Sequence, residues 1–129
     1  MNASRMNGAP LRVLVVDDDE DLRENLAECL QAAGHEVTQA FDGADALELL
    51  ALNGRPEVVV LDLVMPRLDG RAVAAAVRAS PELRQARLVL MTGVAAWEVR
   101  DAAEFDAVHE KPFDLDQLLA ELEKSRRPT

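Results

Sequence analysis

The feature that most constrains the fold is an apolar run that ends in a single aspartate. Three valines and a leucine occupy residues 58–61, and Asp62 follows them directly. A short apolar run rich in β-branched residues predicts a strand that is buried on both faces. Such strands belong to parallel sheets that are covered by helices on either side. The charge at the end of this strand needs a partner, because an unpaired buried carboxylate is costly.

Short apolar runs and amphipathic segments alternate along the rest of the chain. Besides the run at 58–61, strands are expected at residues 11–16, 36–40, 88–91 and 107–109. Apolar residues at helical spacing predict helices at residues 22–33, 44–51, 71–80, 95–104 and 115–122. Five strand-and-helix units in a row predict an α/β fold. We expect a doubly wound, flavodoxin-like parallel sheet of order 2-1-3-4-5, with helices on both faces.

The length of 129 residues is that of one domain. We place this domain at residues 11–123, between a disordered lead-in at 1–10 and a frayed tail at 124–129. No further domain is expected after Leu122, and so neither DNA binding nor an effector activity within this chain. The net charge of 14 − 24 = −10 disfavours direct binding of nucleic acid or of an anionic membrane. No apolar run approaches the ~20 residues of a membrane span, and no signal peptide is recognisable, so a cytoplasmic location is expected.

The predicted sheet brings acidic residues to one edge. Its topological switch point lies between the first and third strands, and ligands bind there at the carboxyl ends of the strands. The first strand runs into five acids at residues 17–21, and the third runs into Asp62. Helix capping explains one or two of these acids but not all five. Like charges about 4 Å apart repel by about 4 kcal/mol at an effective dielectric constant near 20, and a bound cation would relieve that repulsion.

The residues at this edge are suited to phosphoryl transfer. Thr92 and Lys111 follow the fourth and fifth strands and are expected beside Asp17, Asp18 and Asp62. Carboxylates with retained waters suit Mg²⁺, which usually also contacts phosphate oxygens. A lysine supplies a positive charge for a phosphoryl oxygen. An ionised aspartate can act as a nucleophile and form an acyl phosphate, in a reaction that needs mainly positioning and charge neutralisation.

Four motifs carry a resemblance to a known family. They are VLVVDDD, VVVLDLVMPRLDG, LVLMTG and HEKPF, and they occur in this order at the predicted strand ends. With these motifs the chain resembles the receiver domain of two-component response regulators, from about Leu11 to Leu122. Each motif alone is weak, whereas the four together in this order are highly specific.

The resemblance implies a role for each matching residue. Asp62 would be the phosphoacceptor, Thr92 would hydrogen-bond the phosphoryl group, and Lys111 would pair with it. Gly93 would be kept small beside the phosphoryl group, and the peptide bond between Lys111 and Pro112 would be cis. The Mg²⁺ ion would be held by three carboxylates and one backbone carbonyl, from Asp17, Asp18, Asp62 and Val64.

The resemblance also implies partners. A histidine kinase or histidine phosphotransfer protein would present phospho-histidine, and Asp62 would attack the phosphorus in line. The surface around the fourth and fifth strands would then shift, so that a downstream protein target binds one state better. The chain would take part in its own phosphorylation and dephosphorylation without being a conventional enzyme. Phosphatases with an aspartate nucleophile usually carry a second aspartate two residues later, where this chain has Val64.

The chain departs from the family pattern at one residue and in one segment. Val108 replaces an aromatic residue that usually moves inward with the threonine. The neighbouring His109 is a candidate substitute, with a surface or capping role as the alternative. The segment from Gly93 to Phe105 is shorter than usual and carries Trp97, expected as a partly buried anchor or a partner-binding residue. These departures leave a second function open, a receiver-like interaction module that works without phosphorylation, although all five chemical positions favour the phosphoacceptor.

The residues two positions after Asp62 and after Thr92 predict slow dephosphorylation. They are Val64 and Val94, and neither apolar side chain can readily orient a hydrolytic water. We therefore expect the phosphoryl group to persist once the phosphodonor is removed, which its decay over time measures. A lifetime as short as that of fast chemotaxis-type receivers would contradict this expectation.

Overall fold

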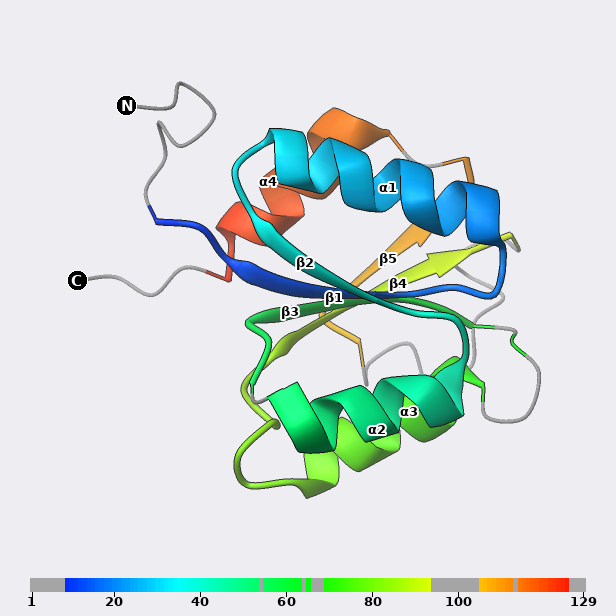
Figure 1. The fold of residues 1–129 in the computed structure, drawn as a ribbon, viewed down its shortest axis with the longest axis vertical. Helices are drawn as coiled ribbons and strands as arrows, with labels where there is room; N and C mark the ends of the chain where they lie inside the picture. The colour runs from blue at the N-terminus through cyan, green and yellow to red at the C-terminus, as the bar shows by residue number, and fades with distance from the viewer. Residues whose placement is uncertain are drawn as a thin grey trace.

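The structure is a computed structural model that describes residues 9–53, 55–63, 65, 69–93, 105–112 and 114–125. Its strands are β1 (Arg12–Val16), β2 (Glu36–Ala40), β3 (Val58–Asp62), β4 (Arg87–Thr92) and β5 (Ala107–Glu110). Its helices are α1 (Glu20–Ala32), α2 (Gly43–Asn53), α3 (Gly70–Ala79) and α4 (Leu115–Glu123). Figure 1 shows three layers, with α1 and α4 on one face of the sheet and α2 and α3 on the other.

The sheet has the predicted strand order. It runs β2-β1-β3-β4-β5, and every neighbouring pair is parallel. In the register, Val16 of β1 pairs with Leu61 of β3, and Asp62 pairs with Met91 of β4. The residues that follow β1 therefore lie at the same edge as the last residue of β3. The prediction of a doubly wound, flavodoxin-like fold is confirmed.

The core consists of two clusters, one on each face of the sheet, because successive side chains of a strand point to opposite faces. Every residue of β3 is buried, as its unbroken apolar run predicts. Leu14 and Val16 of β1 pack toward α2 and α3, whereas Val13 and Val15 pack toward α1 and α4. The apolar layers hold the strands side by side and so place their carboxyl ends at one edge.

Each of the four described helices begins with a capping aspartate. For α2 it is Asp42, whose Oδ1 accepts a hydrogen bond from the N–H of Asp45 at 2.8 Å. The side chains of Asp19, Asp69 and Asp114 accept hydrogen bonds from backbone N–H groups in the first turns of α1, α3 and α4. Glu20 and Asp21 occupy the first turn of α1, where negative charge is favoured. Capping thus accounts for the later members of the acidic run and leaves Asp17 and Asp18 without that role.

Some predictions concern residues that lie outside the described part of the chain. They are the helix at 95–104, Trp97, the carbonyl of Val64, and the structure of residues 1–8 and 126–129. Among the helices that are described, none is both long enough and apolar enough to cross a membrane.

A buried carboxylate holds α4 against the sheet. Glu121 is 7% exposed and accepts a hydrogen bond from Arg87 of β4 at 3.1 Å. Lys124 Nζ lies 3.2 Å from the same carboxylate, and His109 Nε2 of β5 lies 3.5 Å from it. Burial raises the pKa of Glu121, but hydrogen bonds and charge from Lys124 and Arg87 outweigh it and leave the pKa below its ordinary value. Glu121 is therefore ionised at neutral pH.

The substitution Glu121→Gln is expected to lower the free energy of unfolding by about 1–3 kcal/mol at pH 7, because Arg87 loses its charged partner. A carboxylate whose pKa is lowered by folding contributes its full stabilisation at pH values above its pKa in the unfolded chain, which is about 4.3. That stabilisation is lost as the pH falls through the lower folded value. In urea unfolding, the difference in the free energy of unfolding between Glu121→Gln and wild type should therefore become smaller below about pH 4. Glu48→Gln, at an exposed position of α2, is the control. A difference that stays constant into acid would contradict the expectation.

Candidate functional site

Five of the predicted site residues lie at the carboxyl edge of the sheet. Asp17 and Asp18 follow β1, Asp62 ends β3, Thr92 ends β4, and Lys111 follows β5. The parallel register brings these strand ends together even though the residues are up to 94 positions apart in the sequence. The sixth predicted contributor, the carbonyl of Val64, lies outside the described residues.

Three carboxylates form a compact acidic cluster. One oxygen from each of Asp17, Asp18 and Asp62 lies within 4.8 Å of the others. Asp17 and Asp62 are buried, whereas Asp18 is exposed. Hard cations such as Mg²⁺ favour a few carboxylate oxygens and keep several waters, which the exposed side of this cluster can admit. The donor set therefore fits a divalent cation.

Lys111 provides the positive charge of the site. Its Nζ lies 3.1 Å from Asp17 Oδ2 and 3.5 Å from Asp62 Oδ1. Burial lowers the pKa of Lys111, but the hydrogen bond and charge of Asp17, with the charge of Asp62, raise it above its ordinary value. The lysine is thus a stable ammonium ion that reaches both buried carboxylates.

The surroundings of Asp62 disfavour its ionised form. Burial and the charge of Asp17 raise the pKa of Asp62, and Lys111 offsets this only in part. The repulsion between the two buried carboxylates therefore persists with Lys111 in place. A cation at the cluster would remove it, which is a second reason to expect a metal here.

Backbone contacts hold Asp17 in one orientation. Its Oδ1 accepts a hydrogen bond from the N–H of Asp19 at 2.9 Å, which leaves Oδ2 to face Lys111. Its own N–H donates to the carbonyl of Ala40 at 3.2 Å, and Arg23 donates to its carbonyl at 3.1 Å. The end of β1 is therefore fixed by β2 and by α1.

Gly70 supports the site and was not singled out from the sequence. It is the first residue of α3, and its N–H donates to the carbonyl of Leu63 at 2.9 Å. A Cβ atom at this position would clash with the backbone oxygen of Asp62 and would lie 3.1 Å from Cα of Leu63. A glycine costs stability at a helical position, so its presence directly after the capping Asp69 was the available signal.

The residues around Thr92 show which sheet face each side chain occupies. Thr92 is buried and alternates with Met91, so it lies on the face of the sheet that α2 and α3 cover. Val108 packs into the core cluster on that same face. His109 lies on the opposite face, where it contacts Glu121 of α4. It is therefore placed to hold α4 and not to replace an aromatic residue beside Thr92.

Two smaller features match the resemblance. An added Cβ at Gly93 would meet no atom of the described residues within 4 Å. The peptide bond between Lys111 and Pro112 is cis. Lys111 also donates its backbone N–H to the carbonyl of Thr92 at 2.7 Å, which ties the ends of β4 and β5 together.

Sequence comparison identifies the family. Residues 13–123 match the response regulator receiver domain. The chain belongs to this family. It is therefore a receiver domain of two-component signal transduction and not a conventional enzyme.

The receiver domain is similar to a curated protein, response regulator MprA of Mycobacterium sp. (strain KMS). The two are 41% identical over 123 residues, which cover 93% of this chain and 52% of MprA. The chain thus spans about half the length of the curated relatives it matches.

Two solved structures share the fold of this receiver domain. The response regulator protein TrrA from Thermotoga maritima, in complex with Mg²⁺-BeF, has a TM-score of 0.80 and 32% identity over 90% of this chain and 99% of its own. The chemotaxis protein CheY4 of Vibrio cholerae has a TM-score of 0.82 and 28% identity over 92% of this chain and 100% of its own.

Proposed function

We propose that this receiver domain accepts a phosphoryl group from a phospho-histidine onto the carboxylate of Asp62. The observation that carries the proposal is that Asp62 lies close to one ammonium ion and two further carboxylates at one edge of the sheet. A nucleophile, a cation for the phosphoryl oxygens and a metal-binding set are thereby within reach of one another. No general base is required, because a carboxylate attacks without losing a proton.

In the proposed step, one bond to phosphorus forms and another breaks. An oxygen of Asp62 attacks the phosphorus, the bond between phosphorus and the histidine nitrogen breaks, and its electron pair stays on the imidazole, which takes up a proton from water. The products are an acyl phosphate and a histidine. Lys111, now held by Asp17 and Asp62, would pair with a phosphoryl oxygen. Thr92, at the neighbouring strand end, would donate a hydrogen bond to another oxygen.

Mg²⁺ is the proposed cofactor. It would be held by Asp17, Asp18 and Asp62, together with the carbonyl of Val64. When bound, it would neutralise charge on the phosphoryl oxygens. The raised pKa of Asp62 and the spacing of the three carboxylates support this assignment. The similarity to TrrA, which was solved in complex with Mg²⁺-BeF, supports it further.

The proposal extends to the biological setting. The phosphodonor would be a histidine kinase or a histidine phosphotransfer protein, and a downstream protein target would read the phosphorylated state. The domain would occupy residues 11–123 and work in the cytoplasm, without direct contact with nucleic acid or membrane.

Incubation with acetyl phosphate tests this function. Intact mass spectrometry is expected to show one added phosphoryl group in the presence of Mg²⁺ and none when EDTA removes the metal. Asp18→Asn should raise the Mg²⁺ concentration needed by about tenfold or more, because an exposed ligand is lost without disturbing the core. Absence of any added group under all conditions would contradict the proposal and leave the phosphorylation-independent interaction module.

A further inference from the structure

Arg23 links three elements around the end of β1. It lies in the first turn of α1, and its side chain is half-buried. Its Nε donates a hydrogen bond to Oε1 of Gln39 in β2 at 3.0 Å, and its Nη1 donates to the backbone carbonyl of Asp17 at 3.1 Å. A guanidinium is planar and presents its N–H groups in a fixed fork. The bond to Gln39 therefore sets the direction from which Arg23 holds the carbonyl of Asp17.

The carbonyl that Arg23 holds belongs to the peptide unit between Asp17 and Asp18, which both lie in the acidic cluster. A peptide unit is planar, so only the dihedral angles on either side of it can change its orientation. Here these are ψ of Asp17 and φ of Asp18. A hydrogen bond that fixes this carbonyl therefore also fixes the direction in which the Asp18 side chain leaves the backbone relative to that of Asp17.

Asp18 depends on this backbone support more than Asp17 does. The carboxylate of Asp17 is held directly, by the N–H of Asp19 and by Lys111. Asp18 is exposed, and its side chain accepts no hydrogen bond from the residues that the structure describes. One of its oxygens nevertheless lies within 4.8 Å of oxygens from Asp17 and Asp62. The backbone conformation is thus what directs Asp18 toward the cluster.

We propose that Arg23 is a positioning residue for the divalent cation. It holds the peptide unit between Asp17 and Asp18 so that both carboxylates face the metal. The inference rests on the proposed function, because it takes the acidic cluster to be the Mg²⁺ site. Groups that orient metal ligands without touching the metal typically contribute about 10–100-fold to metal affinity. Arg23 acts through its hydrogen bonds, since its own positive charge opposes the binding of a cation.

The charge of Arg23 and its hydrogen bonds predict opposite effects on Mg²⁺ affinity. If only the charge mattered, Arg23→Gln would strengthen Mg²⁺ binding, and Arg23→Lys would leave it unchanged. If the hydrogen bonds matter, both substitutions weaken it. Lysine keeps the charge but carries all its donors on one nitrogen, so it cannot hold Gln39 and Asp17 as the planar fork does. The direction of the change therefore separates positioning from electrostatics.

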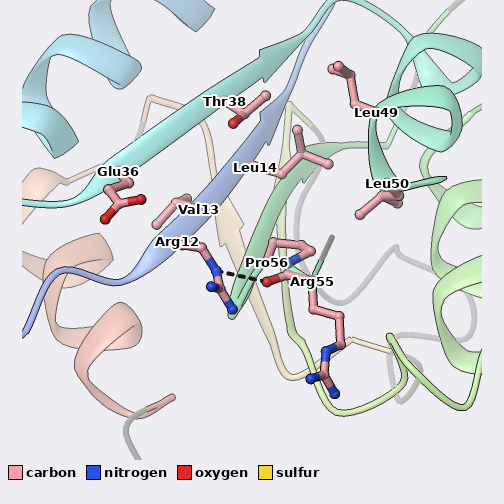
Figure 2. A pocket seen from close by; sticks show the side chains of 9 residues that line it. All are labelled: Arg12, Val13, Leu14, Glu36, Thr38, Leu49, Leu50, Arg55 and Pro56. Atoms are coloured by element: carbon pink, nitrogen blue, oxygen red, sulfur yellow. Dashed lines mark hydrogen bonds between the residues drawn. The ribbon is translucent and has the colours of Figure 1, made fainter. Parts of the chain in front are cut away.

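Calorimetric titration of the whole chain with Mg²⁺, without a phosphodonor, tests the proposal. Arg23→Gln and Arg23→Lys should each weaken Mg²⁺ binding by about tenfold or more. The matched control is Arg12→Gln at the opposite, amino end of β1. Arg12 also donates from its Nε to a backbone carbonyl, that of Arg55 at 3.0 Å, beside a hollow of about 200 Å³ (Figure 2). Its loss should change Mg²⁺ binding less than about twofold, because this exposed side chain lies away from the acidic cluster.

A second measurement needs no metal. The N–H of Asp19 donates to Oδ1 of Asp17 at 2.9 Å, so its hydrogen exchange reports how firmly this turn is held. NMR should show faster exchange of this amide in both Arg23 variants and no change in Arg12→Gln.

Three results would overturn the role of Arg23 alone: unchanged Asp19 exchange, unchanged or tighter Mg²⁺ binding by Arg23→Gln, or equal weakening by Arg12→Gln. A wild-type chain that binds no Mg²⁺ would overturn the proposed cofactor, and this inference with it. Circular dichroism should show that all three variants are folded, because neither arginine belongs to the core.

Discussion

Asp62→Asn is expected to abolish phosphoryl uptake, because an amide oxygen is not an effective nucleophile toward phosphorus. The substitution preserves the shape of the side chain. It also removes a carboxylate whose pKa is raised by burial and by Asp17, so the folded state should lose no stability at neutral pH. Lys111 also lies 3.1 Å from Asp17, and we expect this contact to remain in the variant because it does not involve Asp62. Loss of function should therefore come without loss of fold.

The measurement for Asp62→Asn is intact mass after incubation with acetyl phosphate and Mg²⁺, paired with thermal unfolding. Asp116→Asn is the matched control, since Asp116 is an exposed carboxylate in the first turn of α4 that does not belong to the acidic cluster. It should be phosphorylated like wild type. Full phosphorylation of Asp62→Asn would move the acceptor to Asp17 or Asp18. An unfolded variant would contradict the electrostatic account of Asp62.

Gly70→Ala is expected to destabilise the protein by about 1–3 kcal/mol, the usual cost of adding a methyl group to packed surroundings. The new Cβ would clash with the carbonyl oxygen of Asp62 and crowd the backbone of Leu63. Neither backbone group can rotate away as a flexible side chain would. The end of β3 must therefore shift, and Asp62 shifts with it. A displacement of about 1 Å can slow a positioned reaction about a hundredfold.

Urea unfolding and the rate of phosphoryl uptake together measure the effect of Gly70→Ala. Gly93→Ala is the control for stability, because its added Cβ would meet no atom within 4 Å among the residues that the structure describes. We expect Gly93→Ala to unfold like wild type. The prediction would be contradicted if Gly70→Ala unfolded like wild type and took up the phosphoryl group at the normal rate. The close approach of α3 to Asp62 would then affect neither stability nor phosphorylation.

The elements were predictable because each has a local periodic signal. The unbroken apolar run of β3 predicts burial on both faces, and every residue of this strand is buried. Gly34, the residue after the helix predicted at 22–33, has a φ of 100°, a conformation that favours glycine and ends the helix. Asp114, the residue before the helix predicted at 115–122, accepts a hydrogen bond from the N–H of Gln117 at 3.2 Å. Such signals depend only on residues that are neighbours in the sequence, so they can be read without the structure.

His109 shows why a local signal is not enough. Its position beside Val108 suggested that it could replace an aromatic residue next to Thr92. Adjacent residues of a strand point to opposite faces, so His109 instead meets Glu121 on the side covered by α4. Which residue lies next to His109 on that side depends on how α4 packs across the sheet. No pattern around position 109 contains that information.

The sequence by itself determined the α/β class, the strand order and the meeting of Asp17, Asp18, Asp62, Thr92 and Lys111 at one edge. It could do so because parallel strands with short helical crossovers have few topologies, all with their carboxyl ends at one edge. Only the tertiary structure decided that Lys111 lies nearer to Asp17 than to Asp62, that Gly70 abuts the carbonyl of Asp62, and that His109 faces Glu121. These contacts depend on the packing of side chains from distant segments, at distances of a few ångströms that hydrophobic periodicity does not encode.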